Sequence, residues 1–140
     1  MVLPQTLSLQ IVTPDRSVVQ EVVDEVQIPG SDGYFGVLPG HTPVLTALQV
    51  GELWYRQGQE RFHVAVALGF VEVLPERVTV LADVAERAEE IDVERAETAR
   101  DKMEAALSKP SPDTDQARVR LELAKALIRL QVSTRARARA

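Results

Sequence analysis

Cysteine is absent from the 140 residues, which excludes disulfide bonds, thiolate metal sites and cysteine nucleophiles. Long apolar runs are absent too, because no stretch approaches the roughly 20 residues that a membrane-spanning helix needs. The first ten residues, MVLPQTLSLQ, show no basic segment followed by an apolar one, so we expect no signal peptide. These absences predict a chain that does not span a membrane, and they fit a reducing compartment.

Side chains suited to covalent chemistry are scarce. His41 and His63 are the two histidines, and neither has a second metal ligand at a convincing spacing. The motifs GxSxG, HExxH and GxxxxGK(S/T) are missing, and Gly30–Gly33 has the composition of a turn rather than of a phosphate-binding loop. The chain is therefore predicted to have no catalytic residues and no metal site.

Acidic and basic residues are distributed unevenly. Residues 1–90 contain 5 Lys/Arg and 13 Asp/Glu, whereas residues 91–140 contain 11 and 8. An acidic first part and a basic second part favour two modules that face different partners. Nucleic acid is a poor candidate partner, because the first part is acidic and no aromatic platform accompanies the basic tail.

Residues 1–88 have the pattern of an all-β domain. Leu7, Leu9 and Ile11 alternate with mostly polar neighbours, as in a half-buried strand. Turn-forming residues separate the apolar runs at close intervals, for example in Pro29–Gly33. Short strands at this spacing favour a sandwich or a barrel over alternating βαβ units.

Residues 89–140 have helical periodicity and are predicted to form an antiparallel hairpin of two amphipathic helices. The Pro-containing segment Ser108–Pro112 would interrupt a continuous helix, so we place the connecting loop there. Asp92 is predicted to cap the first helix. Asp113, with Gln116 three residues later, resembles a capping box and is predicted to begin the second.

The two predicted helices present Ala-rich faces, which allow close approach but bury little apolar area. A hairpin of marginal stability can detach from one surface and pack against another. We therefore expect the hairpin to be the mobile part of the protein.

Three segments stand out in order along the chain: Pro29–Pro43 (PGSDGYFGVLPGHTP), Leu68–Val73 (LGFVEV) and Ile91–Ala96 (IDVERA). The first resembles the signature loop of the epsilon subunits of bacterial F-type ATP synthases. The second is similar to the glycine–phenylalanine strand of the same family, with Leu68 where glycine is commoner. The third is similar to the Ile/Leu-Asp-x-x-Arg-Ala motif of its ATP-binding members. The resemblance extends over essentially the whole chain.

The resemblance implies an amino-terminal β-sandwich of about ten strands, followed by the two-helix hairpin. It also implies a non-catalytic rotor subunit of a proton-translocating synthase, in which the sandwich couples the gamma subunit to the c-ring. The hairpin would extend toward the alpha and beta subunits and inhibit ATP hydrolysis. The expected location is the cytoplasmic face of the bacterial inner membrane, with membrane association only through the complex.

Partner contacts are expected in the first of these segments, because exposed loops on rigid strands commonly carry binding. The resemblance places Asp32 and Tyr34 at the c-ring, and Val37, Leu38 and His41 nearer to gamma or to the packing of the loop itself. Without the resemblance, the structural interpretation is favoured, in which the glycines of this segment serve turns and its prolines mark strand boundaries.

The resemblance also implies a nucleotide site. No cofactor is required, but ATP is expected as a regulatory ligand. The residues at positions that match the nucleotide-binding positions of the family are Glu86, Ile91, Asp92, Arg95, Ala96, Lys125 and Arg129. Lys125 stands where ATP-binding relatives have arginine, and lysine keeps the charge but lacks the planar fork. A purely structural interpretation also fits the third segment, with Asp92 as a helix cap, Arg95 in solvent and Ala96 in the packing.

The basic tail has two interpretations. It is either a solvated helix end or a partner for an acidic segment of the beta subunit, which it would meet when the hairpin extends. The arginines concerned are Arg129, Arg135, Arg137 and Arg139. Two other classes of protein stay open, a stand-alone β-sandwich adaptor and a nucleotide-sensing module.

Overall fold

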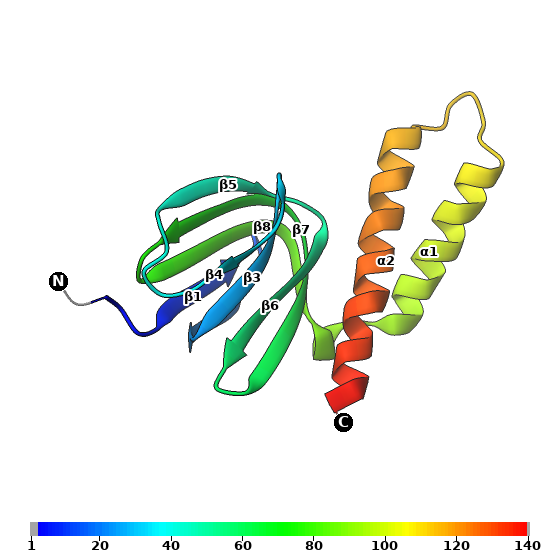
Figure 1. Ribbon diagram of the computed structural model, residues 1–140. Coiled ribbons are helices and arrows are strands. Elements are labelled where there is room, and N and C mark those ends of the chain that lie inside the picture. The colour runs from blue at the N-terminus through cyan, green and yellow to red at the C-terminus, as the bar shows by residue number, and fades with distance from the viewer. Residues whose placement is uncertain (1–2, 140) are drawn as a thin grey trace.

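The computed structural model of the chain describes residues 3–139, the side chains of the last three excepted. A curved β-sandwich is followed by a hairpin of two helices that stands against one side of it (Figure 1). The strands are β1 (Leu7–Val12), β2 (Ser17–Val23), β3 (Glu25–Gly30), β4 (Gly33–Val37), β5 (Val44–Leu48), β6 (Gly51–Gln57), β7 (Glu60–Leu74) and β8 (Arg77–Arg87). A short 3-10 turn η1 (Ala88–Glu90) leads into α1 (Val93–Ser108) and α2 (Gln116–Arg139).

The strands form one mixed sheet in the order β2-β1-β8-β7-β5-β3-β4, with β6 bridging β3 and β7. All neighbouring pairs are antiparallel except β1 and β8. The predicted β-sandwich with a helical hairpin is confirmed. The described residues form eight strands rather than about ten, because β7 and β8 are long: β7 pairs with β6 along its first half and with β5 along its second.

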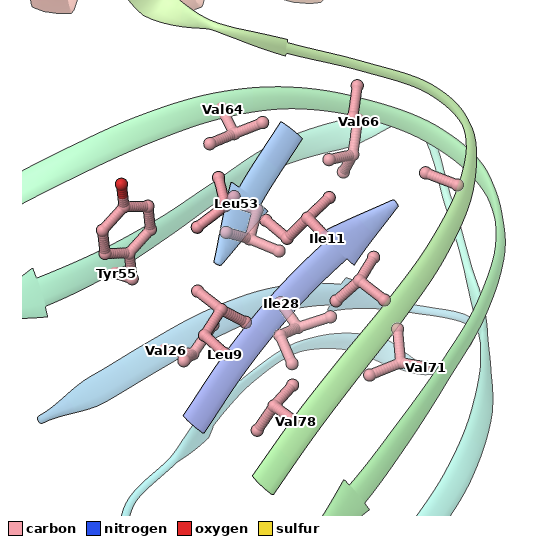
Figure 2. Close-up of a cluster of buried hydrophobic side chains, with 14 of the residues drawn as sticks. Leu9, Ile11, Val26, Ile28, Leu53, Tyr55, Val64, Val66, Val71 and Val78 are labelled. Carbon is pink, nitrogen blue, oxygen red and sulfur yellow. The ribbon is translucent and has the colours of Figure 1, made fainter. Parts of the chain in front are cut away.

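The core of the sandwich consists mainly of aliphatic side chains that point inward from opposing strands, with the ring of Tyr55 among them (Figure 2). In β1 the predicted alternation is confirmed, because Leu7, Leu9 and Ile11 are fully buried while Ser8 is exposed. Burying an aliphatic side chain of this size contributes about 1.5–3 kcal/mol, so this cluster supplies most of the stabilisation of the domain.

A bend in β7 shifts which residues face the core. Val64 and Val66 are buried before the bend, and Val71 and Val73 are buried after it, so the alternation of two slips by one residue in between. The slip falls at residues 68 and 69, whose φ angles are +57° and +135°. A Cβ atom at position 69 would lie 1.9 Å from the carbonyl oxygen of Leu81, so only glycine fits there.

The two helices begin at aspartate caps. Asp92 accepts a hydrogen bond from the backbone N–H of Arg95 at 3.1 Å, as predicted. The predicted start of the second helix at Asp113 is wrong. Asp115 is the cap, because it lies directly before Gln116 and its carboxylate accepts from the backbone N–H of Arg118 at 3.1 Å.

The hairpin meets the sandwich through the carboxyl-terminal half of α2. The buried cluster at this contact consists of Ala65 from β7, Ala88 from η1, Ile91 and Val132, with Ile128 and Ala136 packed against it. Three of these six side chains are single methyl groups, which let the helix lie close to the strands but bury little apolar area. The mobility of the hairpin stays a prediction.

The left-handed backbone at Leu68 generates a stability prediction. A side chain with a Cβ atom costs about 1–2 kcal/mol in this conformation, a cost that glycine avoids. We expect Leu68→Gly to be about 1 kcal/mol more stable than Leu68→Ala in urea unfolding.

The matched control is the same pair of substitutions at Leu45, which is 75% exposed in β5 and has no left-handed backbone. There the order should reverse, because glycine in an ordinary strand is less stable than alanine. Equal effects of both substitutions at position 68 would contradict the left-handed conformation.

Candidate functional site

A cleft of about 510 Å³ lies between the end of β8, η1 and the two helices. It brings together five of the seven residues predicted to bind nucleotide, which are Glu86, Asp92, Arg95, Ala96 and Arg129. The other lining residues are Glu90, Ala99 and Glu122. The topology therefore gathers residues 43 positions apart in the chain around one cleft.

Two of the predicted nucleotide residues do not line the cleft. Ile91 is 8% exposed and belongs to the apolar contact between the hairpin and the sandwich. The amino group of Lys125 lies 3.3 Å from the carboxylate of Glu122, one turn earlier on α2. Ile91 therefore supports the docking of the hairpin, and Lys125 is engaged within its own helix.

The cleft contains more negative than positive groups. The Nε atom of Arg129 donates to Glu86 at 2.6 Å, so this guanidinium is already paired. Glu90 is bound by Arg16, and this hydrogen bond lowers the pKa of the carboxyl against the opposing effect of burial. Arg95 is exposed, and among the described side chains no carboxylate lies within ion-pair distance of its guanidinium. An anion entering the cleft would therefore meet Arg95 first and would compete with Glu86 for Arg129.

A second polar contact joins α2 to the sandwich around Glu52 of β6. This carboxylate is buried, at 6% exposure. It lies 2.6 Å from Nδ1 of His63 and accepts hydrogen bonds from Gln131 at 2.9 Å and from Nε of Arg135 at 3.0 Å. A second nitrogen of Arg135 lies 3.4 Å from the other carboxylate oxygen.

The environment of Glu52 lowers its pKa. Burial alone would raise the pKa of this carboxyl, because it disfavours the charged form. The hydrogen bonds from Arg135, Gln131 and His63 outweigh that effect, and the net shift is below the ordinary value of 4.5. Glu52 is therefore a carboxylate that prefers to be charged when the hairpin is docked.

The sequence pattern did not indicate Glu52. In β6 the apolar side chains of Leu53 and Tyr55 point into the core, so Glu52 occupies an outward position where a charged residue is ordinary. It is buried between His63 of the sandwich and Gln131 and Arg135 of α2, and such packing between distant segments leaves no local signal in the sequence.

The five predicted partner residues of the first signature segment lie in different environments. Asp32 and Leu38 are exposed. Tyr34 is 55% exposed, and its hydroxyl accepts the backbone N–H of Glu52 at 3.2 Å. Nδ1 of His41 lies 2.6 Å from the carbonyl oxygen of Thr42. Val37 is fully buried in the core, so it serves the packing of the sandwich rather than contact with a partner.

The basic tail is partly engaged with the sandwich. Arg129 and Arg135 are paired with Glu86 and Glu52, both of which belong to the sandwich. The side chains of Arg137 and Arg139 lie outside the described part of the structure. Arg129 and Arg135 already have carboxylate partners in the docked state. They could therefore meet an acidic partner only after the hairpin detaches.

An exposed apolar row crosses the outer face of the sandwich, and the sequence pattern did not indicate it. In the strand register Leu81 lies opposite both Val12 and Phe70, and Phe70 lies opposite Ala47. Phe70 and Leu81 are 61% and 54% exposed. Together with Leu45, which lies two residues before Ala47 on β5 and opposite Glu72, these residues form what we call the apolar row. Contiguous exposed apolar surface is a feature of candidate contacts with other proteins.

The described residues offer few features of other functional classes. Within residues 3–139 no group of three or more histidine, aspartate or glutamate side chains is arranged to hold a metal ion. Neither helix in this range has the length and apolar character needed to cross a membrane. The described residues thus form a β-sandwich with a docked helical hairpin, the two-domain architecture that the sequence comparison below also finds.

Sequence comparison identifies the family. Residues 6–88 match the beta-sandwich domain of the ATP synthase delta/epsilon chain, and residues 89–134 match its long alpha-helix domain. The chain belongs to this family. The prediction of an ATP synthase epsilon chain, a non-catalytic stalk subunit of the synthase, is thereby confirmed.

Similar proteins agree over nearly the whole chain. The ATP synthase epsilon chain of Nitratidesulfovibrio vulgaris is 48% identical over 128 residues, covering 91% of this chain and 96% of the relative. The ATP synthase epsilon chain of Geobacter sulfurreducens is 46% identical over 133 residues, covering 94% of this chain and 96% of the relative. A chain of the Euglena gracilis mitochondrial ATP synthase has the same fold, with a TM-score of 0.79 at 23% identity, over 99% of this chain and 84% of that chain.

The depressed pKa of Glu52 predicts how docking of the hairpin depends on pH. The pKa of Glu52 is lower in the docked state than its ordinary value of 4.5. Its charged form therefore favours docking at pH values above 4.5, and this contribution is lost as the pH falls through the lowered pKa. We expect the hairpin to detach progressively as the pH falls below about 4.5, through the lowered pKa of Glu52. The cysteine-free chain can be labelled at Gln59→Cys and Ser111→Cys, and energy transfer between the two dyes reports the separation.

The control is the same labelled chain with Glu52→Gln, which removes the titrating group. Its energy transfer should change less over this pH range, because only the other carboxylates titrate. Identical profiles for the two proteins would show that Glu52 has no part in the acid response.

Proposed function

We propose that this chain works in the rotor of a proton-translocating bacterial ATP synthase, where the sandwich couples gamma to the c-ring and the hairpin restrains ATP hydrolysis. The observation that carries the proposal is the contrast between a large sandwich core and the small apolar contact that holds the hairpin. A structure of the Tetrahymena thermophila ATP synthase central stalk and c-ring contains a chain of similar fold, with a TM-score of 0.56 at 12% identity. The subunit would be peripheral, attached to the cytoplasmic face of the inner membrane through the complex.

The apolar row supports a permanent contact with gamma. Its residues come from four neighbouring strands of the sandwich, which hold them in a fixed pattern. Covering apolar surface contributes about 25 cal/mol per Å², and side chains held by paired strands suit a partner that must stay bound while torque passes through. The exposed Asp32 and Leu38 remain available for the polar loops of the c-ring.

The hairpin supports a conditional contact with the alpha and beta subunits. Its release exposes the apolar face of α2 around Ile128 and Val132, which a competing surface can then cover. Release also frees Arg129 and Arg135 from the sandwich. These arginines would then pair with carboxylates on the catalytic head, and an extended hairpin there would block rotation in the direction of hydrolysis.

ATP is proposed as a regulatory ligand of the cleft, favoured by the position of Arg95 and Arg129 at its lining. ATP that binds the docked hairpin better than the extended one shifts the population toward the non-inhibitory form, by at most its difference in affinity. The carboxylates of the cleft oppose the phosphates, so Mg²⁺-bound ATP is the suitable species. Scarcity of ATP would then release the hairpin and restrain hydrolysis.

Reconstitution tests the assignment. A catalytic head stripped of its epsilon subunit is supplied with the full chain, with a truncation ending at Glu90, or with the full chain carrying Phe70→Glu. We expect the full chain to inhibit ATP hydrolysis and the truncation to bind without inhibiting, because the inhibitory hairpin is missing. Phe70→Glu should bind gamma at least tenfold more weakly, since a charge then lies in the apolar row.

The matched control for Phe70→Glu is Val22→Glu, at a residue that is 62% exposed on β2, the strand at one end of the sheet order. It should bind gamma as the unmodified chain does. Binding of both full chain and truncation with inhibition by neither would remove the regulatory part of the proposal. Failure of both to bind gamma would leave a stand-alone adaptor as the better interpretation.

Nucleotide binding is tested by titration calorimetry of the full chain with Mg²⁺-ATP. Loss of one charge-assisted contact predicts that Arg95→Ala raises the Kd about tenfold or more. Arg120→Ala is the control, because this exposed arginine of α2 does not line the cleft and should leave the Kd unchanged. Equal affinity of the Arg95 variant and the unmodified chain would exclude this cleft as the ATP site.

A further inference from the structure

Glu52 occupies an unusual position for a carboxylate. It lies on the outward side of β6, where the end of α2 packs over it, and its side chain is only 8% exposed. Docking of the hairpin therefore withdraws a charged group from water. That withdrawal is unfavourable unless the helix supplies replacement hydrogen bonds, because an unpaired buried charge is strongly destabilising.

Helix α2 supplies these replacements from two successive turns. Gln131 donates to one carboxylate oxygen, and Arg135 donates to the other through Nε while a second nitrogen reaches the first oxygen. His63, from the neighbouring strand, lies against the same oxygen as Nε of Arg135. The carboxylate is thus fixed by the sandwich on one side and bound by the hairpin on the other.

This contact is separate from the nucleotide cleft. The cleft is lined by residues of β8, η1, α1 and the middle of α2, whereas Glu52 and its partners come from β6, β7 and the end of α2. Neither Gln131 nor Arg135 lines the cleft. A bond between hairpin and sandwich therefore exists that requires no nucleotide.

We propose that Glu52 is a latch that holds the hairpin docked in the absence of nucleotide, through its contacts with Gln131 and Arg135. The proposal deepens the proposed function, on which its regulatory meaning rests. The latch sets the fraction of chains whose hairpin is free to inhibit, and ATP in the cleft acts on top of that fraction. An acidic partner surface opens the latch by taking Arg135, whose side chain is 47% exposed and open to approach from solvent.

Burial distinguishes this latch from an ordinary surface ion pair. Glu72 and Arg77 lie 3.8 Å apart with both side chains about half exposed, so water and salt screen their attraction. Glu52 is shielded, and its partners are aligned for hydrogen bonding. The other charged or titratable groups that face it are His63 and Arg61 of β7, Tyr34 of β4 and Arg135 of α2, and none of these is a carboxylate.

Hydrogen exchange on the isolated full chain tests the latch. The variant Glu52→Gln keeps the shape of the side chain but removes its charge. We expect the backbone amides of residues 128–136 to exchange about 10- to 100-fold faster, the range expected for lost hydrogen bonds to a charged group. Amides of β1 and β8 should keep their protection, which shows that the sandwich remains folded.

The control variant is Glu72→Gln, which makes the same chemical change in a carboxylate that does not contact the hairpin. It should leave exchange of residues 128–136 unchanged. Arg135→Gln should accelerate exchange as Glu52→Gln does, and the double variant should add little to either single one, because each removes the same contact. Unchanged exchange in Glu52→Gln, or fully additive effects in the double variant, would overturn the latch.

Hydrolysis assays separate this proposal from the proposed function. If both hold, Glu52→Gln inhibits the catalytic head at lower concentrations than the unmodified chain, because more hairpins are free. Faster exchange without any inhibition supports the latch and rejects the inhibitory function. Unchanged exchange together with normal inhibition by the unmodified chain rejects the latch alone.

Discussion

Close approach of a helix to a strand is the constraint on which the arrangement of this molecule depends. Ala65 of β7 and Ala88 of η1 present single methyl groups to α2, so the helix can lie against the sandwich. Larger residues at these positions would hold α2 away from β6. Only at the observed separation can Gln131 and Arg135 reach Glu52, and only then is that carboxylate shielded. The polar contact therefore follows from the apolar one.

The contact between the two parts of the chain combines little apolar area with well-paired charges. Such an interface is specific in its geometry but weak in its hydrophobic contribution, because the favourable burial of a few small side chains is offset by the desolvation of the carboxylates. A strong apolar interface would hold the hairpin permanently. A contact that relies partly on ion pairs can instead exchange partners, since another carboxylate offers an arginine nearly the same environment.

Local patterns were sufficient for most of the fold. Alternation in β1 and the cap at Asp92 depend on neighbours within a few positions, and both are found as predicted. The turn expected at Pro29–Gly33 is present but shorter, because Pro29 and Gly30 end β3 and Gly33 begins β4. The cap of α2 was misplaced by two residues, because Asp113 and Asp115 are equivalent by composition and only the backbone path selects between them. Family motifs indicated five of the residues that line the cleft, whereas Glu52 and the apolar row depend on which distant strands and helices lie together. The periodicity of apolar residues within one segment carries no information about which distant segments pack together.

The bend of β7 at Leu68 and Gly69 separates two stretches of one strand. Without it, the alternation of inward and outward side chains would continue unchanged along the whole strand. Before it, odd-numbered residues such as His63 and Ala65 face outward, and after it even-numbered residues such as Phe70 do. Without the slip, Val71 and Val73 would face water and the phenylalanine would enter the core. The φ angles of two residues thus determine which side chains of β7 face away from the core. Because of them, the residues of the hairpin contact and of the apolar row both lie on the side of this strand that faces away from the core.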